Sequence, residues 1–366
     1  MVQLRDGDAG LFSRGERNAR VDPACAIVLE PEVVGTLVRC ALRDMAQGIA
    51  YGTKAVLQPR AEELPALAGR PLEALCPPEE RLNWKLNALV SANARYCAVK
   101  IVGSNACNRA FGQPRSQSLI VLYDKLSMQP LAIFDGTEVS ARRTGAYASM
   151  VVDAALAHRD RISLCLYGAG PIADCVVDDL QAHHRERIDH ILVRSRRPER
   201  AARFATAASR RTGLDVRPIA LAAASPVDMV ITATNAAAPI VAADLLDDEI
   251  VVLHLGGDEL PAAFVEKTLA CGTVVCDDVD SVCHRNSQSL PLFFSRQGVR
   301  LRDLAGLFRI RNLHAMIGQP PATLRRPALF TCVGLPVLDL YLAQWLHEQR
   351  GAGTGLRAGG VHGYPG

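Results

Sequence analysis

The central part of the chain alternates short hydrophobic runs with segments of helical periodicity. Residues 162–167 form a mostly apolar run that ends at a glycine, and residues 171–182 then place apolar side chains at helical spacing. The alternation continues through apolar runs at 188–193, 227–234, 249–255 and 272–277, which are separated by alanine-rich segments such as 198–211. Strands that alternate with helices form parallel sheets covered on both faces. The pattern therefore predicts an α/β fold with a doubly wound, Rossmann-type parallel sheet.

The flanking segments have a different pattern. Short strands joined by polar turns are predicted at 96–102, 118–123 and 131–134, and an amphipathic helix at 336–350. These elements indicate a second, α+β domain to which the chain returns near its end. We expect residues 1–139 and 315–350 to form this substrate-binding domain, residues 140–314 to form the dinucleotide-binding domain, and the glycine-rich residues 351–366 to form a flexible tail.

Composition narrows the possible classes of function. The 366 residues include 41 Lys and Arg against 38 Asp and Glu, a balance that disfavours a basic nucleic-acid-binding module. No apolar run approaches the roughly 18–20 residues of a membrane span, and residues 1–20 lack the apolar core of a signal peptide. The eleven scattered cysteines without C-x-x-C spacing are typical of reduced side chains. We expect a cytoplasmic protein without nucleic-acid or membrane partners.

The first strand of the central block leads into a glycine-rich turn. Gly168, Ala169, Gly170, Pro171 and Ile172 fit the start of the pattern G-x-G-x-x-G/A between a strand and a helix. The first glycine permits a tight turn, the second lets a pyrophosphate approach the backbone, and the helix N-terminus faces the phosphates. The turn therefore predicts a dinucleotide site.

The next strand ends in Arg194, Ser195 and Arg196. An NAD site usually carries Asp or Glu at this point to bind the ribose 2′-hydroxyl, whereas basic residues suit the 2′-phosphate of NADP. The segment therefore favours NADP over NAD. A solvated basic loop is the alternative interpretation.

Two cationic side chains occupy otherwise uncharged faces. Arg143 is the only charge on one face of the helix predicted at 138–156, and Lys100 shares a strand face with uncharged residues. A buried guanidinium needs an anionic partner, which is either a substrate carboxylate or a protein carboxylate. Desolvation lowers the pKa of a lysine and prepares it for acid/base work, although Lys100 at a sheet edge would instead block strand addition.

An acidic pair follows a third strand. Asp258 and Glu259 come directly after Gly256 and Gly257, at the carboxyl end of the strand predicted at 249–255. Ligands bind at this end of open α/β sheets, so either carboxylate is a candidate proton donor or acceptor. The cluster 277–280 is also acidic, but it lacks convergent His or Cys residues. We interpret it as a capping loop and expect no metal.

These motifs together resemble the ornithine cyclodeaminase and μ-crystallin family over roughly residues 50–345. The resemblance rests on the strand lysine, the sequence R-T-G-A at 143–146, G-A-G at 168–170, I-T-A-T-N at 231–235 and G-G-D at 256–258. It implies a homodimer formed through the α+β domain. It also implies that the cofactor site includes Thr232, Ala233, Thr234 and Asn235.

Within the family, G-Q-P-R-S at 112–116 and D-D-V-D-S-V at 277–282 look most like the branch that serves 2,3-diaminopropionate biosynthesis for siderophores. That branch implies NAD(P)-dependent oxidative cleavage of N-(2-amino-2-carboxyethyl)-L-glutamate through an imine. Lys100 and Asp258 would then handle protons, while Arg60, Arg143 and Arg115 would hold carboxylates. The alternatives are ornithine cyclodeaminase, alanine dehydrogenase or ketimine reductase, and a non-catalytic binding protein similar to μ-crystallin. The branch itself suggests NAD, in contrast to the basic segment at 194–196.

Overall fold

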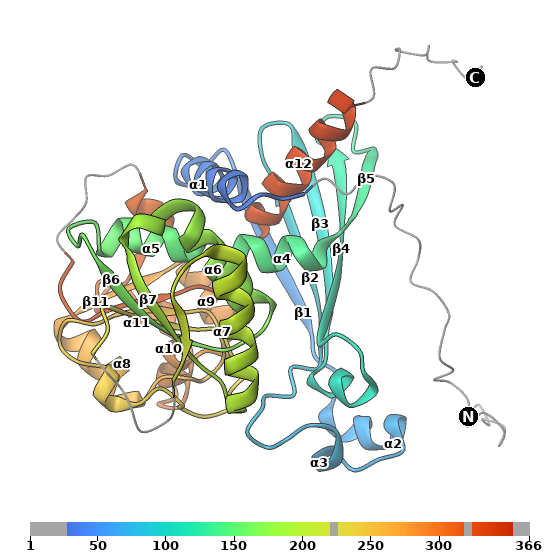
Figure 1. The fold of residues 1–366 in the computed structure, drawn as a ribbon. Coiled ribbons are helices and arrows are strands. Elements are labelled where there is room, and N and C mark those ends of the chain that lie inside the picture. The colour runs from blue at the N-terminus through green and yellow to red at the C-terminus, as the bar shows by residue number, and fades with distance from the viewer. Residues whose placement is uncertain (1–27, 220–225, 318–323, 354–366) are drawn as a thin grey trace, which may run out of the picture.

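The structure is a computed structural model that describes residues 28–219, 226–317 and 324–353. Two sheets lie side by side in separate lobes (Figure 1). The predicted fold class, a Rossmann-type parallel sheet in an α/β protein, is confirmed. Within the described ranges, every helix falls short of the length and hydrophobicity that a bilayer crossing requires.

The smaller lobe is an antiparallel sheet of five strands in sequence order. Its strands are β1 (Tyr51–Leu57), β2 (Lys85–Ala92), β3 (Tyr96–Ser104), β4 (Ser116–Asp124) and β5 (Pro130–Asp135). The last helix, α12 (Pro336–Gly353), and α4 (Gly136–Gly145) pack against one face of this sheet (Figure 1). The short helices α2 (Leu64–Ala68) and α3 (Leu72–Leu75) lie between β1 and β2 in the chain.

The larger lobe is a parallel sheet of eight strands in the order β12-β11-β13-β10-β9-β6-β7-β8. The strands are β6 (Ile162–Tyr167), β7 (Ile188–Arg194), β8 (Val216–Pro218), β9 (Met229–Thr232), β10 (Val251–His254), β11 (Thr273–Cys276), β12 (Arg311–Asn312) and β13 (Ala328–Thr331). Its helices are α5 (Tyr147–Ala155), α6 (Pro171–His184), α7 (Pro198–Thr212), α8 (Ala262–Cys271), α9 (Val279–Arg285), α10 (Ser289–Ser295) and α11 (Leu301–Leu304). The central strands are short and almost wholly apolar because helices cover both faces.

Three expected boundaries differ from the structure. The dinucleotide-binding segment does not end at residue 314, because β13 pairs in parallel with β10 and β11 within the large sheet. The helix expected at 138–156 is two helices, α4 and α5, that meet at Ala146. The tail expected at 351–366 overlaps the end of α12, and its residues 354–366 lie outside the described part of the chain.

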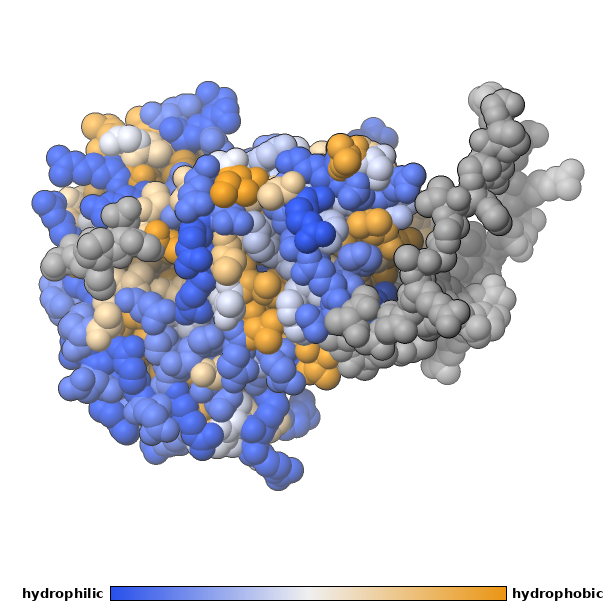
Figure 2. All heavy atoms as spheres, turned by 90° about the horizontal axis from the view of Figure 1, so that it is seen from above, coloured by the Kyte–Doolittle hydropathy of each residue, from blue (hydrophilic) through white to orange (hydrophobic). Residues whose placement is uncertain are grey.

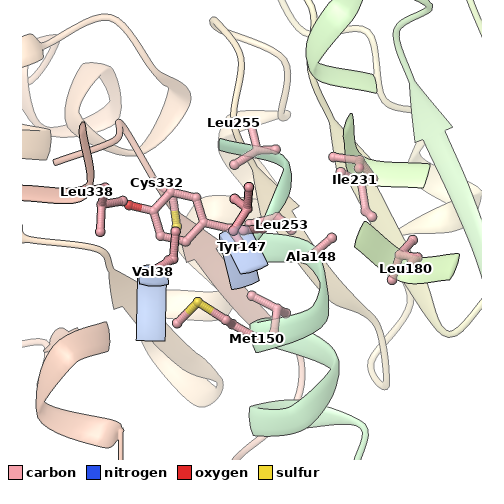
Figure 3. Close-up of a cluster of buried hydrophobic side chains, with 14 of the residues drawn as sticks. Val38, Tyr147, Ala148, Met150, Leu180, Ile231, Leu253, Leu255, Cys332 and Leu338 are labelled. Carbon is pink, nitrogen blue, oxygen red and sulfur yellow. The ribbon is translucent and has the colours of Figure 1, made fainter. Parts of the chain in front are cut away.

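One hydrophobic core joins the two lobes. Figure 3 shows the ring of Tyr147, from α5, among Val38 of α1 (Pro31–Ala46), Cys332 after β13 and Leu338 of α12. The same cluster includes Leu253 of β10, in the middle of the parallel sheet. Close-packed cores are nearly incompressible. This packing therefore fixes the position of the small sheet relative to the loops at the carboxyl ends of the parallel strands.

Candidate active site

The glycine turn after β6 has the geometry of a dinucleotide-binding loop. Gly168 has φ +127°, and a Cβ there would lie 2.8 Å from the carbonyl oxygen of Ala233. Gly170 is the N-cap of α6, where no side chain caps the helix and a Cβ would meet nothing within 4 Å. The first-turn amides of α6 and the open space beside Gly170 therefore fit a pyrophosphate.

The segment after β9 lies against this turn. Ala233 N donates to Tyr167 O over 2.8 Å, and Thr234 N donates to Glu259 Oε1 over 2.7 Å. Asn235 faces the other lobe: its Nδ2 donates to Arg81 O over 2.6 Å, and its Oδ1 accepts hydrogen bonds from Asn83 and, over 3.4 Å, from Arg115 Nη1. Asn235 thus holds the segment after β9 against the residues around Arg81, Asn83 and Arg115.

The basic segment after β7 divides into two parts. Arg194 is buried, and its guanidinium lies over the Tyr167 ring while Nη1 donates to Tyr167 Oη over 2.9 Å. Arg196 is exposed and forms an ion pair with Glu80 over 3.0 Å. Gly168 N donates to Arg194 O, which places Ser195 next to the glycine turn. The Arg194 side chain therefore packs on the sheet, whereas Ser195 and Arg196 lie next to the glycine turn.

Lys100 is buried on the face of β3 that meets the helices. Its Nζ donates to Asp339 Oδ1 of α12 and to Ser140 Oγ of α4, both over 2.7 Å. Burial lowers the pKa of Lys100 to about 8; Asp339 opposes that shift and Arg143 adds to it. A lysine with such a pKa exchanges protons near neutral pH.

Arg143 reaches the same carboxylate from α4. Its Nε donates to Asp339 Oδ1 over 3.2 Å, and its Nη1 donates to Thr144 Oγ1 over 2.8 Å. The guanidinium packs on Gly334, where a Cβ would overlap Arg143 Nη1. Burial acts to lower the pKa of Arg143, but Asp339, Tyr147 and Asp277 together outweigh it and the pKa is raised. Two cations thus share one carboxylate, so the buried cluster keeps a positive charge that suits a substrate carboxylate.

Asp277, at the carboxyl end of β11, braces the loop behind Arg143. Its Oδ2 accepts hydrogen bonds from Tyr147 Oη and from the amides of Val333 and Gly334, over 2.7–2.9 Å. Burial raises the pKa of Asp277 to about 6. The neighbouring Asp278 is the N-cap of α9 and accepts the Ser281 amide, so the expected capping role holds for this one residue of the acidic cluster. The described part of the chain contains no group of three or more His, Cys, Asp or Glu side chains arranged for a metal.

The two candidate acids after β10 have different surroundings. Glu259 is buried, with Oε1 accepting the amide of Thr234 and Oε2 lying 3.3 Å from His254 Nε2. Asp258 is equally buried and forms an ion pair with Arg296, but its Oδ1 has no hydrogen-bond partner among the described residues. Glu259 Oε2 also lacks a hydrogen-bond partner among these residues, so each acid keeps one unpaired oxygen as a candidate proton acceptor, and neither acid contacts Lys100.

The family model of the ornithine cyclodeaminase/mu-crystallin family matches residues 74–353. The chain belongs to this family. A Δ1-pyrroline-2-carboxylate reductase of Bacillus cereus is 24% identical over 71% of this chain and 79% of its own length. The structure of the Thermococcus litoralis Δ1-pyrroline-2-carboxylate reductase with NADH and L-proline superposes with a TM-score of 0.73, at 22% identity over 91% of this chain and 97% of that one. An archaeal alanine dehydrogenase dimer with bound NAD has a TM-score of 0.71, at 19% identity over 89% and 93%.

In this family member, the predicted site residues separate into groups. Lys100 and Arg143 lie together, and Arg115 meets Asn235 at the boundary between the lobes. Arg60 is exposed beyond the end of β1, where it pairs with Glu63 over 2.5 Å and contacts neither Lys100 nor Arg143. The structure does not bring Arg60 into the cluster.

Asp339 is the site residue that sequence reasoning missed. It is the single acid in the apolar segment that starts α12, and it lies one turn from the helix N-terminus. A lone carboxylate on an otherwise buried helix face signals a cationic partner, by the same reasoning that singled out Arg143. The sequence pattern could therefore have indicated Asp339, but the strand and helix that carry its cationic partners could not be identified without the fold.

Proposed function

We propose that this chain is a nicotinamide-dependent dehydrogenase that oxidatively cleaves N-(2-amino-2-carboxyethyl)-L-glutamate to 2-oxoglutarate and L-2,3-diaminopropionate. The carrying observation is the buried cluster of Lys100, Arg143 and Asp339, which has one net positive charge while Lys100 is protonated and contains a lysine whose pKa is about 8. The relatives named for imino-acid reduction and alanine oxidation support the broader class, NAD(P)-dependent chemistry at a carbon–nitrogen bond.

The reaction needs a proton acceptor and a carboxylate clamp. Neutral Lys100 takes a proton from the secondary ammonium, and Arg143 holds a carboxylate next to the reacting carbon. A nicotinamide held at the glycine turn after β6 would supply the hydride acceptor for the glutamyl α-carbon. Water then adds to the resulting imine, with Asp258 as acceptor of its proton, and the C–N bond breaks. The conjugate, one oxidised cofactor and one water give 2-oxoglutarate, diaminopropionate, one reduced cofactor and one proton.

The same residues would serve a reductase of a cyclic imine, which the names of the relatives favour as a second candidate. The two candidates differ in direction and in substrate charge. A reductase consumes reduced cofactor with an imino acid such as Δ1-pyrroline-2-carboxylate and releases no 2-oxoglutarate.

We propose NADP as the preferred cofactor. The segment after β7 offers Ser195 and Arg196 beside the glycine turn, and its nearest following acid is the exposed Glu199. Arg200 Nε donates to Ala169 O over 3.0 Å, which adds a third cationic or polar side chain at this edge. A 2′-phosphate would find donors here, whereas a ribose 2′-hydroxyl would lack its usual carboxylate acceptor.

We propose a homodimer through the outer face of the small sheet. Apolar side chains on this face of the sheet are exposed. Seen from above, the right-hand lobe also has several orange patches on its surface (Figure 2). The exposed set on the sheet face comprises Tyr51, Leu57, Leu86, Val90, Ile101, Leu119 and Ile133. An apolar surface spread over five strands marks an interface, and the similar alanine dehydrogenase is described as a dimer.

The test is a spectrophotometric panel at the absorbance band of reduced nicotinamide. Purified protein receives NADP or NAD with the glutamate–diaminopropionate conjugate, ornithine, alanine or proline. The proposal predicts reduction of one cofactor per 2-oxoglutarate released from the conjugate. Proline formation from ornithine without net reduction, or oxidation of reduced cofactor by the cyclic imine alone, would replace it with one of the alternatives.

A further inference from the structure

Three cations that have no ion-pair partner in the described part of the chain lie beside the Lys100 cluster. In the sheet register, Lys54 of β1 pairs with Leu89 of β2, which in turn pairs with Lys100 of β3, so both lysines point to the same face. Lys85 lies four residues before Leu89 and therefore shares that face. Arg285 approaches from the end of α9, where its Nη1 donates to Val333 O over 3.4 Å.

None of these three cations has a carboxylate within 4 Å among the described residues. The nearby acids are already engaged: Asp339 holds Lys100 and Arg143, Asp277 accepts four hydrogen bonds, and Glu80 pairs with Arg109 and Arg196. Burial and the neighbouring Arg285 lower the pKa of both lysines to about 7. Gathering like charges in a partly desolvated place is costly unless an anion completes the cluster.

An unsatisfied amide lies between these cations. Asn87 is on the same face of β2, two residues from Lys85 and two from Leu89, and is 6% exposed. Its Oδ1 has no hydrogen-bond partner among the described residues. Native structures rarely leave a buried polar atom unpaired, and an amide oxygen accepts hydrogen bonds, so Asn87 indicates a ligand that carries a donor such as an amine or ammonium group next to its carboxylate.

We infer that Lys54, Lys85 and Arg285 form a subsite for a second, distal carboxylate of the substrate. The inference rests on the proposed function and narrows it to amino-acid conjugates with at least two carboxylates. Strand spacing puts the backbone of Lys54 about 10 Å from that of Lys100. Lysine side chains are long enough for both ammonium groups to contact one ligand across this distance. In the proposed substrate, the side-chain carboxylate of the glutamyl half occupies this subsite. A diamine such as ornithine would bring its second ammonium group to the same cations and be repelled.

Binding of a non-reacting tricarboxylate tests the subsite without turnover. Tricarballylate is titrated by calorimetry into wild-type protein, Lys54→Met, Lys85→Met and the double variant, each saturated with oxidised cofactor. Lys267→Met is the matched control, because Lys267 is a half-buried lysine of α8 that pairs with Asp248. We expect the double variant to lose at least tenfold in affinity, with circular dichroism and cofactor affinity unchanged, and the control to match wild type. Equal affinities for wild type and the double variant would overturn the subsite.

Turnover separates the subsite from the proposed function. The conjugate is compared with an analogue whose glutamyl half is replaced by 2-aminobutyrate, which lacks the distal carboxylate. The variants should lower kcat/KM at least tenfold for the conjugate and less than twofold for the analogue. If wild type oxidises neither compound, the proposed function fails, and the tricarballylate titration still decides the subsite. Equal losses for both compounds would contradict a role in holding the distal carboxylate.

Discussion

Replacing Asp339 by Asn removes the one carboxylate that Lys100 and Arg143 share. Asp339 is 1% exposed, and its Oδ1 lies 2.7 Å from Lys100 Nζ and 3.2 Å from Arg143 Nε. The asparagine oxygen can still accept hydrogen bonds, but two buried cations then face each other without an anion. Such a change destabilises a protein by about 3–5 kcal/mol. Because Ser140 keeps its hydrogen bond to Lys100, we expect a loss near the lower end of that range.

The same change should move the pH dependence of turnover. Asp339 raises the pKa of Lys100 against the larger effect of burial, so its removal lowers that pKa further below about 8. A hydrogen bond to a charged group contributes about 1.5–3 kcal/mol. Since about 1.4 kcal/mol corresponds to one pH unit, the shift should be about one to two units. In the proposed reaction neutral Lys100 is the proton acceptor, so the acidic limb of kcat/KM should move to lower pH.

The assay is kcat/KM for the conjugate between pH 6 and 10, with denaturant unfolding measured on the same preparations. Asp179→Asn is the control, because Asp179 is a buried carboxylate that accepts the amide of Ser149 away from this cluster. The control should lose stability and keep the wild-type pH limb. An Asp339→Asn enzyme that is destabilised but keeps its acidic limb would refute Lys100 as the titrating proton acceptor.

The remaining predictions concern the cofactor loop, the sheet face, cofactor choice and the anion subsite. Gly170→Val should weaken binding of reduced cofactor at least tenfold in a fluorescence titration. The melting temperature should not fall, because a Cβ at this position meets no protein atom. Gly306→Val is the control: its site is equally open, and the change should leave cofactor binding unchanged. Ile101→Glu should convert a dimer to a monomer in light scattering, whereas the same change at Leu307, exposed on the larger lobe, should not; a wild-type monomer would contradict the interface. Arg196→Ala should lower kcat/KM for NADP at least fivefold and leave that for NAD within twofold, and equal losses would remove Arg196 from 2′-phosphate recognition. Tricarballylate should raise the melting temperature more at pH 6 than at pH 9, because the lysines with pKa about 7 are protonated, and bind the anion, only below that pH; a larger rise at pH 9 would contradict this linkage.

The parallel sheet could be predicted from the sequence because its strands carry unbroken apolar runs next to regular helical spacing. β13 was not recognised because its apolar run of four residues follows a segment without a helix pattern. β1 and β2 were not recognised because one face carries Lys54, Lys85 and Asn87 beside the buried Leu89. On the opposite face, apolar side chains such as Leu86 are exposed. Hydrophobic alternation predicts which face is buried only when the other face meets water.

The candidate site was predictable where a charge stands out locally. Lys100 and Arg143 each interrupt an apolar face, so their burial with an anionic partner could be expected from spacing alone. Their partner could not, because Asp339 lies almost two hundred residues from Arg143 in the chain and meets it only through the packing of α12 on the small sheet. The contact of Arg194 with Tyr167 could not be predicted either, because this stacking depends on the pairing of β7 with β6.

The most direct test of the central claim uses the conjugate with deuterium at the glutamyl α-carbon. The account predicts that the reduced cofactor gains one deuterium by mass spectrometry, in step with the release of 2-oxoglutarate. Release of 2-oxoglutarate with unlabelled reduced cofactor, or no cofactor reduction by the conjugate under any condition in which the protein binds the cofactor, would contradict oxidation at this carbon.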